Sequence, residues 1–293
     1  MDTAELLARC DFGDENELAL GVSGGADSTA MALLAAEAGR SFAIWHVHHG
    51  LREASDTEAE LVEKLAASLG VPYELRRLEL TDGPDLEATA REARYTALPA
   101  DVCVAHTADD RAETVLLNLL RGAGLAGVAA PFSRVRRPII GLRRAETSAL
   151  CEFAGVPVVD DPMNDDPRFA RVVVRGQLMP AAANALRRDP VPLLNRHADL
   201  VADALMVIQD AAAGLDATDT AALRAAPRAV ASEALRQWLM AESGNRLAVD
   251  AASISRVMDV VDGSARATEV EGGIRVARTT GRLRLDHPPQ RRE

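Results

Sequence analysis

Six consecutive residues near the start of the chain have the types and order of an anion-binding loop. The segment reads Ser23-Gly24-Gly25-Ala26-Asp27-Ser28, between an apolar stretch at 18–22 and an amphipathic helix pattern at 28–38. Glycines free backbone N–H groups to face an anion, and a helix N-terminus adds a favourable dipole. The lysine of a Walker A loop is missing. The alternative, a plain strand-to-helix turn, is disfavoured by the six-residue pattern.

Two acidic residues at the start of a later predicted helix could serve metal or phosphate chemistry. The segment 106–114 follows a short apolar strand at 101–105 and opens a helix that runs to about 121. Asp110 and Glu113 lie three positions apart, so their carboxylates share one helical face. Beside a triphosphate, such oxygen ligands are what Mg²⁺ needs. Helix capping is the alternative, and it explains Asp109 better than it explains this pair.

Histidines and arginines elsewhere could complete a nucleotide pocket. His49 begins the segment His-Gly-Leu-Arg, which closes a predicted strand at 41–47. With no cysteine or fourth ligand nearby, the histidines there are weak evidence for zinc. Arg91 lies in a predicted helix at 85–98, and an arginine aimed at phosphates stabilises charge that develops on transfer. Taken alone, Arg91 could equally be part of an ordinary helix surface.

Alternating strand and helix patterns in the first half position these residues. Strands are predicted at 18–22, 41–47, 72–80 and 101–105, with helices between them. Repeated β-α units predict an α/β fold, a doubly wound parallel sheet with helices on both faces. Ligands of such sheets bind beyond the carboxyl ends of the strands. The segments at 23–28, 46–52 and 106–113 all fall at that edge, which predicts a single active site.

The second half changes character after Pro180. Residues 189–192 read as a linker, and helices are predicted at 193–213, 220–226, 228–242 and 250–261. A hairpin is predicted at 268–271 and 274–278, with a further strand at 282–285. We therefore expect a catalytic domain at 1–188 and a helical, hairpin-containing C-terminal region at 189–293.

Composition and charge limit the class of protein. The 293 residues are 48% hydrophobic and lack a run of eighteen apolar residues, so we expect a globular protein that does not enter membranes. Three distant cysteines and the absence of a signal-peptide core favour a cytoplasmic location. The net charge of −11 argues against nucleic acid, but residues 134–188 hold ten arginines and six acidic residues. That stretch could contact RNA or be a solvated surface.

Five segments together resemble the tRNA(Ile)-lysidine synthetase family of pyrophosphate-loop ATPases, which cleave ATP between the α and β phosphates. The resemblance covers roughly residues 18–180 and is especially close over 113–124. It is carried by residues 23–28, 49–52, 90–95, 106–114 and 160–165. It implies an N-type ATP pyrophosphatase fold, which is adenine nucleotide alpha hydrolase-like, followed by a helical region and a small α+β region that binds tRNA.

The resemblance also implies a reaction. The protein would ligate L-lysine to C2 of the wobble cytidine in isoleucine tRNA with a CAU anticodon. The C2 oxygen would attack the α-phosphate of ATP, and lysine would then displace AMP. The implied catalytic residues are Asp27, Arg91, Asp110 and Glu113, with Mg²⁺ held by Asp27, Asp110 and Glu113. The implied ATP-binding residues are Ser23, Gly24, Gly25, Ala26, Asp27, Ser28, His49, Arg91 and His106, and the implied tRNA-binding residues are Arg171 and Arg175.

Three positions depart from the family pattern, and two other functions stay open. Thr107, Arg111 and Val172 replace a histidine, a glutamine and an asparagine that the family usually carries, which leaves their contacts unassigned. Another pyrophosphate-loop activity, such as tRNA thiolation, is an alternative, although no C-x-x-C pair is present. An RNA-binding protein without catalysis is disfavoured by the carboxylate set. The sequence leaves the oligomeric state open, with a homodimer as one option.

Overall fold

The computed structural model describes residues 2–48, 54–78, 97–129, 135–159, 170–243 and 249–286. Within these ranges the chain divides into two compact units, residues 1–123 with 130–198 and residues 124–129 with 199–293. No helix of the described part is long and apolar enough to cross a membrane. The predicted catalytic domain at 1–188 and C-terminal region at 189–293 stay predictions, because a division into compact units does not test what each part does.

A parallel four-stranded sheet organises the first unit. Its strands are β1 (Leu18–Gly21), β2 (Phe42–His48), β3 (Tyr73–Arg77) and β4 (Cys103–Val104), in the order β3-β2-β1-β4. Buried and half-buried residues alternate along β2, so one set of its side chains faces the core. The sheet class predicted from the sequence is confirmed, and helices at 26–37 and 54–69 connect β1 to β2 and β2 to β3, as parallel strands require.

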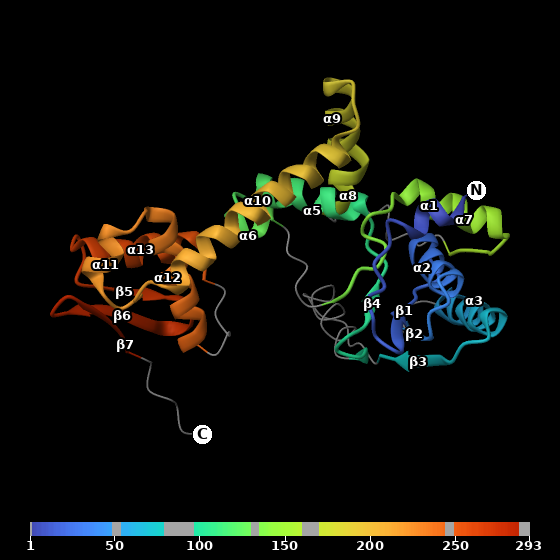
Figure 1. Cartoon of the computed structure of the whole chain (residues 1–293), viewed down its shortest axis with the longest axis horizontal. Helices are drawn as coiled ribbons and strands as arrows, with labels where there is room; N and C mark the ends of the chain where they lie inside the picture. The colour runs from blue at the N-terminus through green and yellow to red at the C-terminus, as the bar shows by residue number, and fades with distance from the viewer. Residues whose placement is uncertain are drawn as a thin grey trace. The chain divides into compact units, whose positions relative to one another are not determined.

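Helices of the first unit pack beside this sheet (Figure 1). They are α1 (Thr3–Leu7), α2 (Ala26–Glu37), α3 (Ala54–Leu69) and α7 (Arg144–Ala154), whereas α5 (Ala108–Leu120) follows β4 and runs away from the sheet. Leu20 and Ile44 of the strands, Met31 and Leu34 of α2, and Leu150 of α7 are all buried in one apolar core. This core fixes α2 and α7 against each other and so fixes the residues at their N-termini.

A second, smaller cluster ties three more helical segments to α5. They are α8 (Ala170–Val173), a π-helical turn (Val174–Leu178) and α9 (Met179–Leu186), which follow one another directly. Ala108 and Ala112 of α5 pack with Val174, Met179 and Val191. The packing places the start of α5 beside α8 and the π-helical turn.

The second unit combines helices with a three-stranded antiparallel sheet, as predicted. The sheet order is β5-β6-β7, with β5 at Ala267–Val270, β6 at Ile274–Thr279 and β7 at Arg282–Asp286, and a 3-10 turn (Glu271–Gly273) joins β5 to β6. The helices are α6 (Leu125–Val128), α11 (Thr220–Ala225), α12 (Arg228–Glu242) and α13 (Ala251–Asp262). Leu235, Leu239, Val257 and Val276 are fully buried in its separate core.

The segment predicted as a linker is the start of a helix instead. Helix α10 spans Pro190–Ala213, and the division between the two units falls inside it. Asp189 Oδ1 accepts a hydrogen bond of 3.0 Å from the N–H of Val191. A proline in the first turn loses no hydrogen bond and has its φ already set for a helix. Asp-Pro-Val-Pro therefore begins α10 rather than separating it from what precedes.

Candidate active site

The loop at 23–28 is held in shape by its own serine. Ser28 Oγ donates to the carbonyl of Gly25 at 3.0 Å and accepts from the N–H of Ser23 at 3.1 Å. Gly24 adopts a φ of 91°, which side chains other than glycine rarely tolerate. Gly25 is the N-cap of α2 and supplies no side-chain cap. The backbone N–H groups at the start of α2 are therefore arranged for an anion.

Asp27 lies in the first turn of α2, where a threonine from α7 holds it. Thr147 Oγ1 donates a short hydrogen bond to Asp27 Oδ1, and Arg144 Nε lies 3.8 Å from Asp27 Oδ2. Burial raises the pKa of Asp27 to about 6, while the hydrogen bond from Thr147 acts in the opposite direction. Asp27 thus titrates closer to neutrality than an exposed aspartate.

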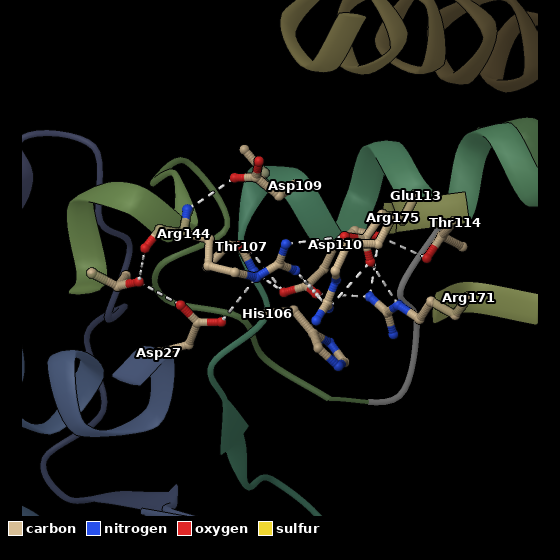
Figure 2. Close-up of polar contacts among 12 residues, drawn as sticks. Asp27, His106, Thr107, Asp109, Asp110, Glu113, Thr114, Arg144, Arg171 and Arg175 are labelled. Carbon is tan, nitrogen blue, oxygen red and sulfur yellow. Dashed lines mark hydrogen bonds and ion pairs between the residues drawn. The ribbon is translucent and has the colours of Figure 1, made fainter. Parts of the chain in front are cut away.

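Asp110 and Glu113 lie on one face of α5, as predicted, and three arginines surround them (Figure 2). Arg144 bonds Asp110 at 2.8 Å and Glu113 at 3.0 Å. Arg171 contacts the same two carboxylates at 2.9 Å and 3.0 Å. Arg175 Nε donates to Glu113 at 3.0 Å. We call this group the α5 ion cluster: Asp110, Glu113, Arg144, Arg171 and Arg175.

The α5 ion cluster is largely withdrawn from solvent. Glu113 is 2% exposed and Asp110 is 7% exposed, whereas the three arginine side chains are each about one third exposed. Burial acts to raise the pKa of Asp110, but Arg171 and Arg144 outweigh it and hold that pKa below its usual value. Asp110 is therefore an anion at neutral pH.

Thr107, which departs from the family pattern, fixes one side of Asp110. It is fully buried, and its N–H and hydroxyl donate to Asp110 Oδ2 at 2.7 Å and 2.9 Å. This is the start of α5, where acidic side chains satisfy backbone N–H groups. Capping of α5 involves Asp110 rather than Asp109, contrary to the expectation from the sequence, and Asp109 pairs with Arg143 at 3.0 Å. Thr107 thus supports Asp110 in place of the histidine that the family carries.

His106 lies close to the α5 ion cluster, between β4 and α5 (Figure 2). Its Nδ1 accepts a hydrogen bond of 2.8 Å from Arg137 Nε. Because Nδ1 accepts, a proton on the neutral ring is on Nε2.

A pocket of about 230 Å³ adjoins the α5 ion cluster. Charged groups of both signs line it, among them Asp109, Asp189 and Arg143. Met179 and Val191 give it an apolar side.

The predicted site residues are only partly brought together by the structure. Arg144 contacts all three predicted carboxylates, so Asp27, Asp110 and Glu113 lie around one guanidinium. Arg171 and Arg175 contact Asp110 and Glu113, and their predicted binding of tRNA stays a prediction. His49, Arg91 and the segment 160–165 lie outside the described residues. Their roles stay predictions.

Sequence reasoning missed Arg144 and Thr147. Both lie in the first turns of α7, which carries no motif that singles them out. The signal that could have found them is the pair Arg143-Arg144 at a helix start, where positive charge is unfavourable. An arginine at such a position therefore predicts an acidic partner that offsets its charge.

The fold and site are those of the PP-loop class of ATP-binding domains. A sequence model of the PP-loop domain family matches residues 2–182. The U34-tRNA thiolase NcsA from Methanococcus maripaludis has a similar fold, with a TM-score of 0.51 and 16% identity, over 68% of this chain and 78% of that chain. At this identity the likeness concerns the fold alone.

Relatives named tRNA(Ile)-lysidine synthase match most of the chain. The protein of Bordetella pertussis is 40% identical over 77% of this chain and 80% of its own length. That of Salinispora tropica is 34% identical over 96% of this chain and 94% of its own length. The chain belongs to the tRNA(Ile)-lysidine synthase family and has the ATP-dependent ligase activity of that family. The resemblance predicted from the sequence is thereby confirmed.

Proposed function

We propose that this protein ligates L-lysine to C2 of the wobble cytidine of isoleucine tRNA with a CAU anticodon. The C2 oxygen attacks the α-phosphate of ATP, the bond between the α and β phosphates breaks, and pyrophosphate leaves. The lysine amine then attacks C2, and AMP leaves. Adenylation is needed because the oxygen of a urea-like carbonyl is a poor leaving group. Because the proposed substrate is a tRNA, we propose a cytoplasmic location.

The observation that carries this proposal is the arrangement of the loop at 23–28 in a chain of this family. Its preformed backbone N–H groups would bind the pyrophosphate of ATP. The three carboxylates and Arg144 lie next to that loop, where charge develops during transfer. Arg91, His49 and His106 are proposed to complete the ATP site, as the family resemblance implies.

Asp27 fits a Mg²⁺ ligand better than the other two predicted carboxylates. Both oxygens of Asp110 and both of Glu113 accept hydrogen bonds from protein donors. Among the described residues, no three His, Cys, Asp or Glu side chains are arranged to hold a metal. When bound at Asp27, Mg²⁺ would neutralise phosphate charge. Asp110 and Glu113 would become ligands only by giving up a hydrogen bond that they already accept, from an arginine or, at Asp110 Oδ2, from Thr107.

The pocket beside the α5 ion cluster supports lysine as the second substrate. Lysine carries an ammonium at each end, a carboxylate and an apolar stem of four carbons. The pocket offers acidic groups such as Asp189, basic groups such as Arg143, and the apolar side chains of Met179 and Val191. This combination suits a zwitterion with an aliphatic chain.

The test is lysine transfer. The purified protein is incubated with ATP, Mg²⁺, radiolabelled lysine and isoleucine tRNA that bears a CAU anticodon. We expect label in the tRNA and release of AMP and pyrophosphate in equal amounts. A matched tRNA with a GAU anticodon should stay unlabelled, because it has no cytidine at the wobble position. Sulfur transfer instead of lysine transfer would favour the thiolase alternative.

A further inference from the structure

Thr147 is a fully buried residue that touches the nucleotide loop from outside the predicted site. Thr147 Oγ1 donates to Asp27 Oδ1. Thr147 Oγ1 also lies 2.8 Å from the carbonyl oxygen of Arg144. A hydroxyl has one proton, so only one of these acceptors receives it at a time. An ionised Asp27 is the stronger acceptor.

The alternative partner of Asp27 is close. Arg144 Nε lies 3.8 Å from Asp27 Oδ2, and opposite charges at that distance attract strongly in a partly buried site. Without the hydroxyl, the carboxylate would rotate toward the guanidinium of Arg144. Its oxygens would then face away from an incoming cation.

The packing around Thr147 is rigid enough to transmit its position. Leu150 and Cys151 of α7 are buried in the same core as Met31 of α2. Cys151 Sγ also donates to the carbonyl of Ala26, at 3.4 Å. α7 therefore cannot shift relative to the start of α2 without opening this core.

We propose that Thr147 is a positioning residue that orients the Asp27 carboxylate for the metal-bound nucleotide. The inference rests on the proposed function of Asp27 as the Mg²⁺ ligand. Thr147 itself touches neither the metal nor the nucleotide. Its effect passes through a hydrogen bond to a charged group, which is stronger than one between neutral groups.

The test is a direct titration with Mg²⁺ and α,β-methylene-ATP, which cannot be cleaved between the α and β phosphates. Thr147→Val keeps the side-chain shape and removes the hydroxyl, and should weaken binding of this probe about tenfold. Thr147→Ser keeps the hydroxyl and should bind within about twofold of the wild type. Thr220→Val removes an equally buried hydroxyl, bonded to Gly281 in the other unit, and should bind normally.

A double-mutant cycle separates positioning from a general loss of packing. In an Asp27→Asn background, adding Thr147→Val should change the affinity for the probe less than about twofold. An equal loss in both backgrounds would overturn the proposal, and so would normal binding by Thr147→Val. Because the titration contains no tRNA or lysine, its failure is distinct from a failure of lysine transfer.

Discussion

The residues of the α5 ion cluster differ in burial and in how many partners lose a contact when one of them is replaced. Glu113 and Asp110 are buried and bound by guanidinium groups, whereas each arginine keeps about a third of its side chain in water. Loss of a buried carboxylate leaves several cations without a partner at once. Loss of one arginine leaves both carboxylates with other donors.

Asp110→Asn should abolish turnover and leave the fold intact. The amide keeps the shape and can still accept from Thr107, but it removes the charge that faces Arg144 and Arg171. Breaking a fully buried ion pair costs about 3–5 kcal/mol of stability. The cost here should be smaller, because the partly exposed arginines can be hydrated again. Lysine transfer and thermal unfolding, measured together, check this.

Thr114→Val is the matched control for Asp110→Asn. Thr114 lies one turn further along α5 and bonds only the Asp110 carbonyl, at 2.8 Å. This variant should keep activity within about threefold of the wild type, since a single half-buried hydroxyl bonded to a backbone carbonyl contributes little. Near-normal turnover by Asp110→Asn would remove Asp110 from the site.

At the scale of elements, the turn between β1 and α2 depends on Gly24. Gly24→Ala would force an L side chain to a φ of 91° and bring its Cβ within 3.2 Å of Val159 Cγ2. The left-handed conformation alone costs about 1–2 kcal/mol. We expect lower thermal stability and a loss of at least tenfold in affinity for ATP, because the loop must shift. Calorimetric titration with ATP measures the second effect.

Gly70→Ala separates backbone strain from damage to the loop. Gly70 also has a positive φ, of 68°, but nothing lies within 4 Å of a Cβ built there. This variant should lose about 1 kcal/mol of stability and bind ATP normally. If it also lost ATP affinity, strain at Gly24 would not be specific to the nucleotide loop.

Much of the fold was predictable because its elements carry local signals. The apolar segment at 41–47 predicted β2 as a buried strand, and α12 was predicted with the bounds Arg228–Glu242 that the structure shows. The start of α10 was not predicted, because Pro190 and Pro192 are typical of linkers as well as of the first turns of helices. Local sequence cannot separate those two uses of proline.

The site was predictable where its residues are close in sequence. The loop at 23–28 is one continuous segment, and Asp110 and Glu113 lie within α5, so spacing alone relates the residues of each. Arg144 and Thr147 reach the same place from α7, more than a hundred residues after the loop. Their contacts depend on how α2 packs against α7, which no local pattern encodes.

At the scale of the whole molecule, all three cysteines belong to the first unit. Cys10, Cys103 and Cys151 lie within residues 1–198, and burial raises the pKa of each to about 11. At pH 8 about one in a thousand of such thiols is ionised. Iodoacetamide should therefore label none of them rapidly until the first unit unfolds. Mass spectrometry across a urea series, compared with circular dichroism, checks this.

The same thiols set a direction for stability against pH. Their pKa in the folded protein lies above the 9.0 of a free thiol. Their contribution to the free energy of unfolding is therefore intact below pH 9 and is lost as the pH rises from 9 toward 11. Cys151→Ala, which cannot ionise, should lose less stability over that interval than the wild type. Rapid labelling of Cys103 in the native protein at pH 8 would contradict its burial.

The α5 ion cluster also determines how any further cation can enter. Since Asp110 Oδ1 and both Glu113 oxygens already accept from guanidinium groups, a metal ion or an ammonium group that binds there must displace a guanidinium. A displaced arginine would keep its charge and could then pair with an anion nearby. We therefore expect entry of a cation at these carboxylates to favour binding of a phosphate beside them.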